Sequence, residues 1–159
     1  MKNPNIGISE INRKAIAEQL SKILADEFVI YSKTLNAHWN IEGPDFHSVH
    51  LFLENLYKEQ QGIVDTVAEK IRIIGHYVPA QLAKYLELTH LSETTPEKND
   101  SRTLYGDLLE AHESIIIFIR ENIKPFAEKL KAEGISDYIT GLMEQHEKTA
   151  WMLRAHLSH

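Results

Sequence analysis

The stretch FHSVHLFLENLYKEQQGIVDTVAEKIRII, residues 46–74, decides the fold. Its apolar residues recur at the three- and four-residue spacing of an amphipathic helix, and the periodicity continues without a break for eight turns' worth of chain. Asp45 stands where an N-cap is favoured, and Gly75 stands where a left-handed C-cap is favoured. The sequence therefore predicts one long helix from Phe46 to Ile74.

Polar side chains that can ligate a metal lie on one face of this helix. At about 100° per residue, four of them fall at roughly 0°, 40°, 60° and 100°: His50, Glu54, Asp65 and Glu69. His50 and Glu69 are separated by roughly 28 Å along the axis, at about 1.5 Å per residue, whereas a ligand must lie within about 2 to 2.6 Å of its ion. One helix therefore supplies two half-sites. An antiparallel two-fold dimer completes both when the end carrying His38, His50 and Glu54 faces Asp65 and Glu69 of the partner subunit.

Ordinary salt bridges are the alternative for the carboxylates on this face of the helix, which we call the stripe. Apolar residues run beside it and predict that much of the helix is buried, where carboxylates need partners: Leu51, Leu53, Val64, Val67, Ala68 and Ile71. Lys58, Lys70 and Arg72 offer such partners without any metal. A plain helical bundle that binds no metal stays open on this ground, although the two histidines at one end of the stripe favour a metal.

The ligand types narrow the choice of metal. The chain has no cysteine, which removes thiolate sites, disulfides and iron–sulfur ligation. Imidazole and carboxylate together suit iron, zinc or manganese, and a sparse site of oxygen donors leaves coordination positions open. Because open positions on a redox metal allow reaction with an oxidant, iron(II) is expected here rather than a closed structural zinc.

Length and composition predict one compact domain. The chain has 159 residues, of which 43% are apolar, and this suits a single domain spanning 1–159 with a short N-terminal tail at 1–8. An apolar signal segment is not evident near the N-terminus, and about 18 uncharged apolar residues never run together. We therefore expect a soluble, cytoplasmic protein without a membrane partner.

Three further long helices complete an all-α fold. They are expected at Ser9–His38, from Ser101 to before Gly134 with a kink or interruption at Pro125, and at Ser136–Leu157. Some 25 residues connect the second and third of the four helices, too many for a bare loop, and a short helix is expected at Pro79–Glu87. The pattern predicts a four-helix bundle with one long crossover, which is the ferritin-like plan.

The same residues resemble a known family. The segment AHWNIEGPDF (37–46), followed by Val49-His50 and by DTVAEK (65–70), is similar to the signature of Dps, the DNA-binding protein from starved cells, a ferritin-like miniferritin. The segment EKTAWML (147–153) resembles the last helix of that family, so the resemblance covers nearly the whole chain. The short crossover helix is also similar to the Dps plan, in which it lies at the dimer interface.

The resemblance implies a ferroxidase centre at a dimer interface. The matching ligands are His38, His50, Glu54, Asp65 and Glu69, which would oxidise iron(II), preferably with hydrogen peroxide, and hold at most two irons per site. Dps commonly has Asp where this chain has Glu54, and this departure leaves the second iron position in doubt. The resemblance further implies a dodecameric shell of two-fold dimers in which Fe(III) mineralises, protecting the cell from oxidative stress.

Other residues receive roles from the resemblance or from their position. Trp39 is expected to shelter the iron or donate electrons to it, although an aromatic residue can also simply fill the core. His47 is a candidate for supporting the ligands from outside, although at helical spacing it points about 60° away from His50. Glu133 and Asp137 would line an acidic pore for iron, although Asp137 also fits an ordinary acidic first turn of a helix. Surface or capping roles are the default for the remaining histidines: His76, His90, His112, His146, His156 and His159.

DNA binding is the alternative function. Dps proteins that coat DNA often use a mobile basic tail, and such tails act by neutralising phosphates. Residues 1–8 carry only Lys2, and the net charge is −6 per chain. Because that charge is multiplied in a shell, we expect weak or no DNA binding near neutral pH.

Overall fold

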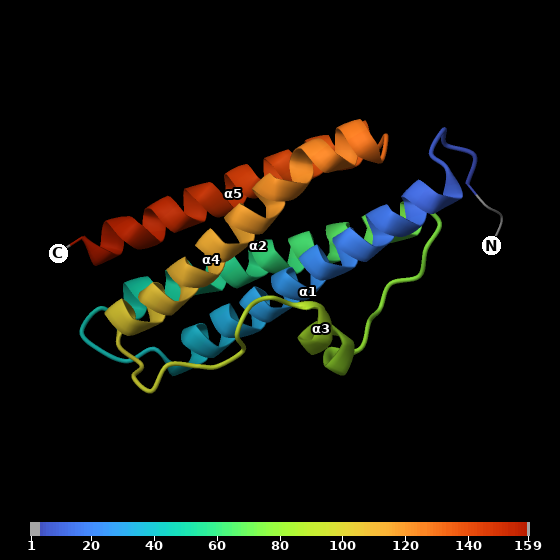
Figure 1. Cartoon of the computed structure of the whole chain (residues 1–159). Helices are drawn as coiled ribbons and strands as arrows, with labels where there is room; N and C mark the ends of the chain where they lie inside the picture. The colour runs from blue at the N-terminus through green and yellow to red at the C-terminus, as the bar shows by residue number, and fades with distance from the viewer. Residues whose placement is uncertain (1–3, 159) are drawn as a thin grey trace.

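The computed structural model describes residues 4–158, which leaves Lys2 and His159 outside the described part. Within it the chain is helical and contains no strand. The elements, in chain order, are α1 (Glu10–Asn40), α2 (Phe46–Ile73), α3 (Leu82–Leu88), α4 (Ser101–Lys124), the π-helical turn η1 (Pro125–Lys129) and α5 (Glu133–Leu157). Two long antiparallel pairs, α1 with α2 and α4 with α5, form the bundle shown in Figure 1.

The ends of the first two long helices follow from local chemistry. Ser9 caps α1, where its hydroxyl oxygen accepts a hydrogen bond from the Asn12 N–H at 3.2 Å. At the end of α2, Gly75 has a φ of 91°. The Gly75 N–H donates to the Arg72 carbonyl and the His76 N–H to the Ile71 carbonyl, which is the Schellman pattern. The predicted C-cap at Gly75 is therefore confirmed.

Pro125 interrupts the third long helix, as its missing N–H predicts. α4 ends at Lys124, and the chain continues for five residues as η1, where the Leu130 N–H donates to the Pro125 carbonyl at 3.1 Å. The turn into α5 differs from the prediction. Lys131 takes the left-handed conformation, with φ 59°, and α5 begins at Glu133, so Gly134 lies inside the helix rather than ending one.

The crossover between α2 and α4 runs along the outside of α1 and contains α3 (Figure 1). Buried groups of α1 hold it. The Asp26 carboxylate accepts hydrogen bonds from the Thr89 hydroxyl (2.7 Å) and the His90 N–H (3.1 Å), and its second oxygen lies 2.8 Å from the His90 Nδ1. The Lys33 ammonium donates to the Ser92 and Thr94 carbonyls and pairs with Asp107 of α4 at 2.9 Å.

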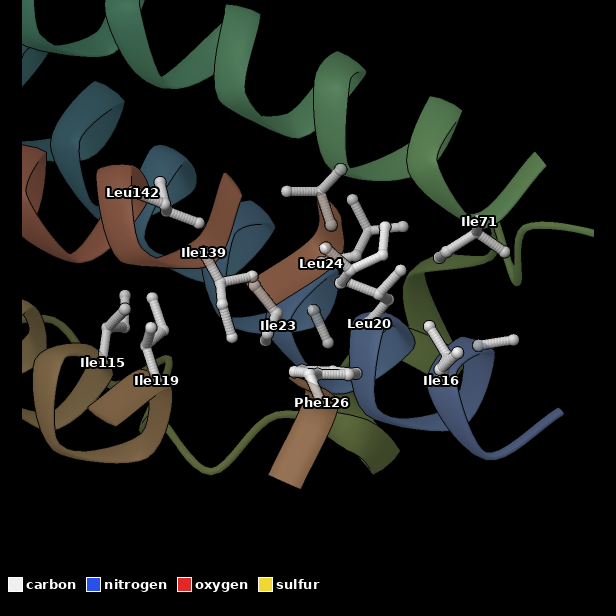
Figure 2. Close-up of a cluster of buried hydrophobic side chains, with 14 of the residues drawn as sticks. Ile16, Leu20, Ile23, Leu24, Ile71, Ile115, Ile119, Phe126, Ile139 and Leu142 are labelled. Atoms are coloured by element: carbon white, nitrogen blue, oxygen red, sulfur yellow. The ribbon is translucent and has the colours of Figure 1, made fainter. Parts of the chain in front are cut away.

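Apolar side chains fill the bundle in two clusters. The larger cluster lies toward the end of the bundle that holds Ile16, Ile71 and Phe126, and Figure 2 shows its side chains converging from several helices. The smaller one lies toward the opposite end and includes Leu53, Leu108 and Leu153. A helix long and apolar enough to span a membrane is not found among residues 4–158.

Candidate metal centre

The two predicted histidine ligands lie against each other, although they come from different helices. His38 is near the end of α1 and His50 is in the first turns of α2. Their rings stack with centroids 3.9 Å apart and an interplanar angle of 23°. The Nδ1 atom of His38 lies 3.0 Å from the His50 carbonyl oxygen, and the Nδ1 atom of His50 lies 2.9 Å from the His38 carbonyl oxygen.

These reciprocal contacts determine the tautomers. A carbonyl oxygen only accepts hydrogen bonds, so each Nδ1 must carry the proton that it donates. In the neutral imidazole the lone pair is then on Nε2 of both rings. Histidines that bind metals usually donate their other ring N–H to a carbonyl or carboxylate in this way. The backbone therefore presents two oriented Nε2 donors of the kind that iron or zinc binds.

Aromatic rings surround the histidine pair. The Tyr57 ring meets His38 edge-on at a centroid distance of 5.1 Å, and the Phe46 ring stacks on His50 at 5.1 Å. Trp39, expected to shelter the iron, is 70% exposed in the subunit. His47, expected to support the ligands, is also exposed. Within one subunit the rings that lie against the histidine pair are therefore those of Tyr57 and Phe46, and the roles of Trp39 and His47 remain predictions.

Glu54 lies near the two histidines, but it is paired with a lysine. Its carboxylate accepts a hydrogen bond from the Lys58 ammonium one turn along α2. This hydrogen bond, and then the lysine charge, lower the pKa of Glu54, and the proximity of His38 and His50 lowers it a little further. The predicted third ligand is therefore ionised and close to the histidines, while the salt bridge that the sequence offered as an alternative is also present.

Asp65 and Glu69 lie farther along α2 and are exposed. Of the apolar residues expected beside the stripe, Leu53, Val67 and Ile71 are buried, Val64 and Ala68 are partly buried against the core, and Leu51 is exposed. Within the described residues, no three His, Cys, Asp or Glu side chains are grouped so that they could hold a metal ion. A site shared with a partner subunit stays a prediction.

The two predicted pore residues lie in the first two turns of α5. Glu133 is the first residue of that helix, Asp137 follows one turn later, and both are exposed. Negative side chains are stabilised at a helix N-terminus by its partial positive charge. Their position suits both the pore and the ordinary helix start, and the pore remains a prediction.

A layer of buried polar side chains crosses the bundle. The sequence patterns did not predict this layer. His112 of α4 and His146 of α5 are 1% and 2% exposed, and their Nδ1 atoms lie 2.8 Å apart. The His146 Nε2 lies 2.8 Å from the carboxylate of Glu27 on α1, which is fully buried. Assigning these two histidines by default to the surface or to caps was wrong. Their spacing was a usable signal, because His112 lies four residues after Leu108 and three before Ile115 on the apolar face.

Gln60 of α2 is a further buried polar side chain. Its side chain is 1% exposed, and among the described residues its amide oxygen and nitrogen have no hydrogen-bond partner; the same holds for Glu27 Oε2 and His112 Nε2. Burial lowers the pKa of His112 well below its ordinary value, and the neighbouring His146 lowers it further. The His146 Nε2 donates to the Glu27 carboxylate, and the hydrogen bond between the two Nδ1 atoms requires one ring to donate and the other to accept.

Comparison with known proteins supports the fold. Residues 17–159 match the ferritin family, described as a ferritin-like domain. A DNA protection during starvation protein of Bacillus anthracis is 31% identical over 91% of this chain and 98% of its own length. The chain belongs to the Dps family. A low temperature-induced protein of Nostoc is also similar, with 32% identity over 95% of this chain and 84% of its own length.

Solved Dps structures agree with this assignment. The Dps protein of Vibrio cholerae, described as a member of a broad superfamily of ferritin-like diiron-carboxylate proteins, is 27% identical, with a TM-score of 0.91 over 99% of this chain and 98% of that one. The Dps resemblance read from the sequence and the predicted all-α ferritin-like bundle are thus confirmed.

Proposed function

We propose that this Dps chain oxidises iron(II) at sites shared between two subunits and stores the product as Fe(III) mineral inside a dodecameric shell. His38, His50 and Glu54 of one subunit bind the iron together with Asp65 of the partner subunit and Glu69 of the partner subunit. Hydrogen peroxide is the preferred oxidant. Two irons give one electron each, the O–O bond breaks, and two protons complete two waters, so hydroxyl radical is not released.

The reciprocal hydrogen bonds of His38 and His50 carry this proposal. They leave an Nε2 lone pair on each ring and hold both rings in place before any iron arrives. A pair of histidines that served only packing would not require both Nε2 lone pairs to stay free for a metal ion. The nearby ionised carboxylate of Glu54 adds the negative charge that a divalent cation requires.

The sharing of the site follows from the helix geometry. Asp65 is 15 residues from His50 on the same helix, which is roughly 22 Å along the axis. A single subunit therefore cannot bring the two ends of α2 to one ion. A two-fold antiparallel contact places each end against the complementary end of the other subunit, and the exposure of Asp65 and Glu69 leaves them available for it.

Protection of DNA, which the names of several relatives state for those proteins, is proposed to be indirect here. Removal of iron(II) and peroxide limits radical damage without contact with the nucleic acid. Direct binding is opposed by the net charge of −6 per chain. A gel-shift titration of plasmid at about 0.15 M salt, where screening is substantial, should show no complex at micromolar protein, and a shifted band would favour the nucleoid-binding alternative.

The direct test removes both histidines. The variant His38→Gly with His50→Gly, assembled as judged by size-exclusion chromatography, should lose rapid anaerobic oxidation of iron(II) by peroxide. His156→Gly is the control, because it makes the same substitution at an exposed histidine of α5. Unchanged kinetics in the assembled double variant would overturn the proposal.

A mixed dimer tests the sharing. A subunit with His38→Gly and His50→Gly, paired with a subunit carrying Asp65→Ala and Glu69→Ala, should contain one complete site and one empty one. Its activity should then exceed that of either parent. If an assembled heterodimer is no more active than the parents, the ligands are not shared in this way.

A further inference from the structure

A groove beside α1 carries positive charge on a chain that is otherwise acidic. It lies between the N-terminal half of α1, the start of the crossover and α3 (Figure 1), and its volume is about 470 Å³. Lys14, Lys22 and Lys84 line it, together with a single carboxylate, Glu18. In the whole chain, by contrast, 23 acidic residues outnumber 17 lysines and arginines. A volume of this size is typical of sites for small ligands.

Lys14 and Lys22 hold the charges of this groove that stay available. They are eight residues apart on α1, which places them on one face of the helix with Glu18 between them. Lys84 pairs with Glu87 at 2.6 Å. Within residues 4–158, no ion pair or hydrogen bond engages the ammonium of Lys14 or that of Lys22. Because one carboxylate cannot neutralise both, the groove attracts an anion.

Tyr77 adds a flat aromatic surface to the same groove. Its side chain is 79% exposed, and the Arg72 guanidinium lies over the ring at 4.5 Å from the centroid. The Arg72 Nη1 also donates a hydrogen bond to the His76 carbonyl at 3.0 Å, which holds the guanidinium in place. The guanidinium covers one face of the ring, so the other face can stack on a flat group of a ligand. Pro79 and Leu88 add apolar surface beside it.

We infer that this groove binds a nucleotide that carries two or more phosphate groups. The phosphates contact the ammonium groups of Lys14 and Lys22, and the base stacks on the open face of the Tyr77 ring. Lysine binds phosphate as a point charge, and every base offers a π-face, so the site recognises the class of ligand rather than one base. This binding goes beyond the proposed oxidation of iron and does not require iron.

A small nucleotide suits the groove better than a DNA duplex. A duplex carries one negative charge about every 1.7 Å of its axis, so it would extend past two lysines onto the rest of a chain whose net charge is −6. The bases of a duplex are also stacked on each other, whereas the Tyr77 ring needs a base that is free to stack on it. The charge and the ring together therefore favour a mononucleotide.

Calorimetric titration of the assembled, iron-free protein in EDTA provides the test. ATP is compared with inorganic tripolyphosphate, which has the phosphates without the base, and with adenosine, which has the base without the phosphates. We expect ATP to bind at least about fivefold more tightly than tripolyphosphate, the low end of the range for one base stacked on an aromatic ring. Adenosine should bind too weakly to measure.

Two variants separate the phosphate contacts from the base contact. Lys14→Gln with Lys22→Gln should weaken both ATP and tripolyphosphate at least about tenfold, because two phosphate contacts are lost. Tyr77→Leu should lower the affinity for ATP to that for tripolyphosphate, and it should leave tripolyphosphate binding unchanged. Lys98→Gln with Lys148→Gln removes the same charge at exposed lysines of the crossover and α5, and it should change either affinity by less than about twofold.

The possible outcomes are distinct. Binding of ATP weaker than about 1 mM, or no tighter than that of tripolyphosphate, overturns the inference, and so does an unchanged ATP affinity in the Lys14 and Lys22 double variant. A complex with duplex DNA that depends on these lysines, in a protein that does not bind ATP, would make the groove a nucleic-acid contact and also overturns it. Since no iron is present in these titrations, each result leaves the ferroxidase proposal to its own test.

Discussion

His112 and His146 share a hydrogen bond between their Nδ1 atoms at 2.8 Å, in a bundle interior where neither ring is more than 2% exposed. One Nδ1 must donate and the other must accept, so at most one of the two rings is protonated on both nitrogens. Because the Glu27 carboxylate lies 2.8 Å from the far side of His146, this chain of three groups links folding to proton binding.

Acid should destabilise the protein through His112. Burial lowers its pKa well below 6.5, so below about pH 6.5 the unfolded chain binds a proton that the folded chain does not. The free energy of unfolding is therefore not reduced by this effect above that pH. As the pH falls below it, the free energy of unfolding decreases by up to about 1.4 kcal/mol per pH unit for one proton. Urea unfolding at fixed protein concentration, over a series of pH values, should show a shallower dependence in His112→Gln. Equal slopes for this variant and an exposed control, His156→Gln, would contradict the prediction.

Removing the Glu27 carboxylate should cost stability throughout the neutral range. Glu27→Leu leaves the buried His146 Nε2–H without its acceptor, and such a loss typically costs about 1–3 kcal/mol. The free energy of unfolding in urea is the measurement. Glu144→Leu, at an exposed glutamate of α5, is the control and should change it by less than about 0.5 kcal/mol. A Glu27 variant as stable as this control would show that the layer contributes nothing.

The Asp26 carboxylate should determine how firmly the crossover is held. Asp26→Ala removes the acceptor for the Thr89 hydroxyl and the His90 N–H together with the contact to the His90 ring. Limited proteolysis should then cut the crossover near residues 89–100 several-fold faster, while the four long helices stay protected. Glu18→Ala, an exposed position on the same helix, should be cut at the wild-type rate. Equal cutting in both variants would place the anchor elsewhere.

Lys58 should weaken binding of a second iron. Lys58→Gln frees the Glu54 carboxylate and removes the neighbouring positive charge that lowers its pKa. Anaerobic calorimetry should show the second iron(II) per site binding several-fold more tightly. Lys84→Gln is a matched control, because Lys84 pairs with Glu87 in a similar exposed contact on α3. A second iron bound no more tightly in Lys58→Gln than in this control would rule out the competition.

Local patterns determined the helices and most of their ends. Apolar spacing predicted the four long helices, Ser9 and Gly75 mark ends where a hydroxyl and a positive φ satisfy the terminal backbone groups, and Pro125 lacks the N–H that an unbroken ladder needs. The predicted start of α5 was wrong because the residue in the left-handed conformation is Lys131. A lysine does not indicate that conformation in a sequence, whereas a glycine would. Non-glycine residues are uncommon in that conformation because it brings Cβ too close to the following carbonyl oxygen.

The sequence by itself determined the family, the bundle and the residue types that face one end of α2, since helical periodicity and ligand spacing are local properties. Only the tertiary structure decided which hydrogen bonds those residues make. It placed His38 and His50 so that each donates to the other's carbonyl, paired Glu54 with Lys58, and buried Glu27, His112 and His146 together. The reason is physical: tautomer, pairing and burial depend on groups from other helices, and their sequence separation of up to 119 residues leaves no local pattern to read.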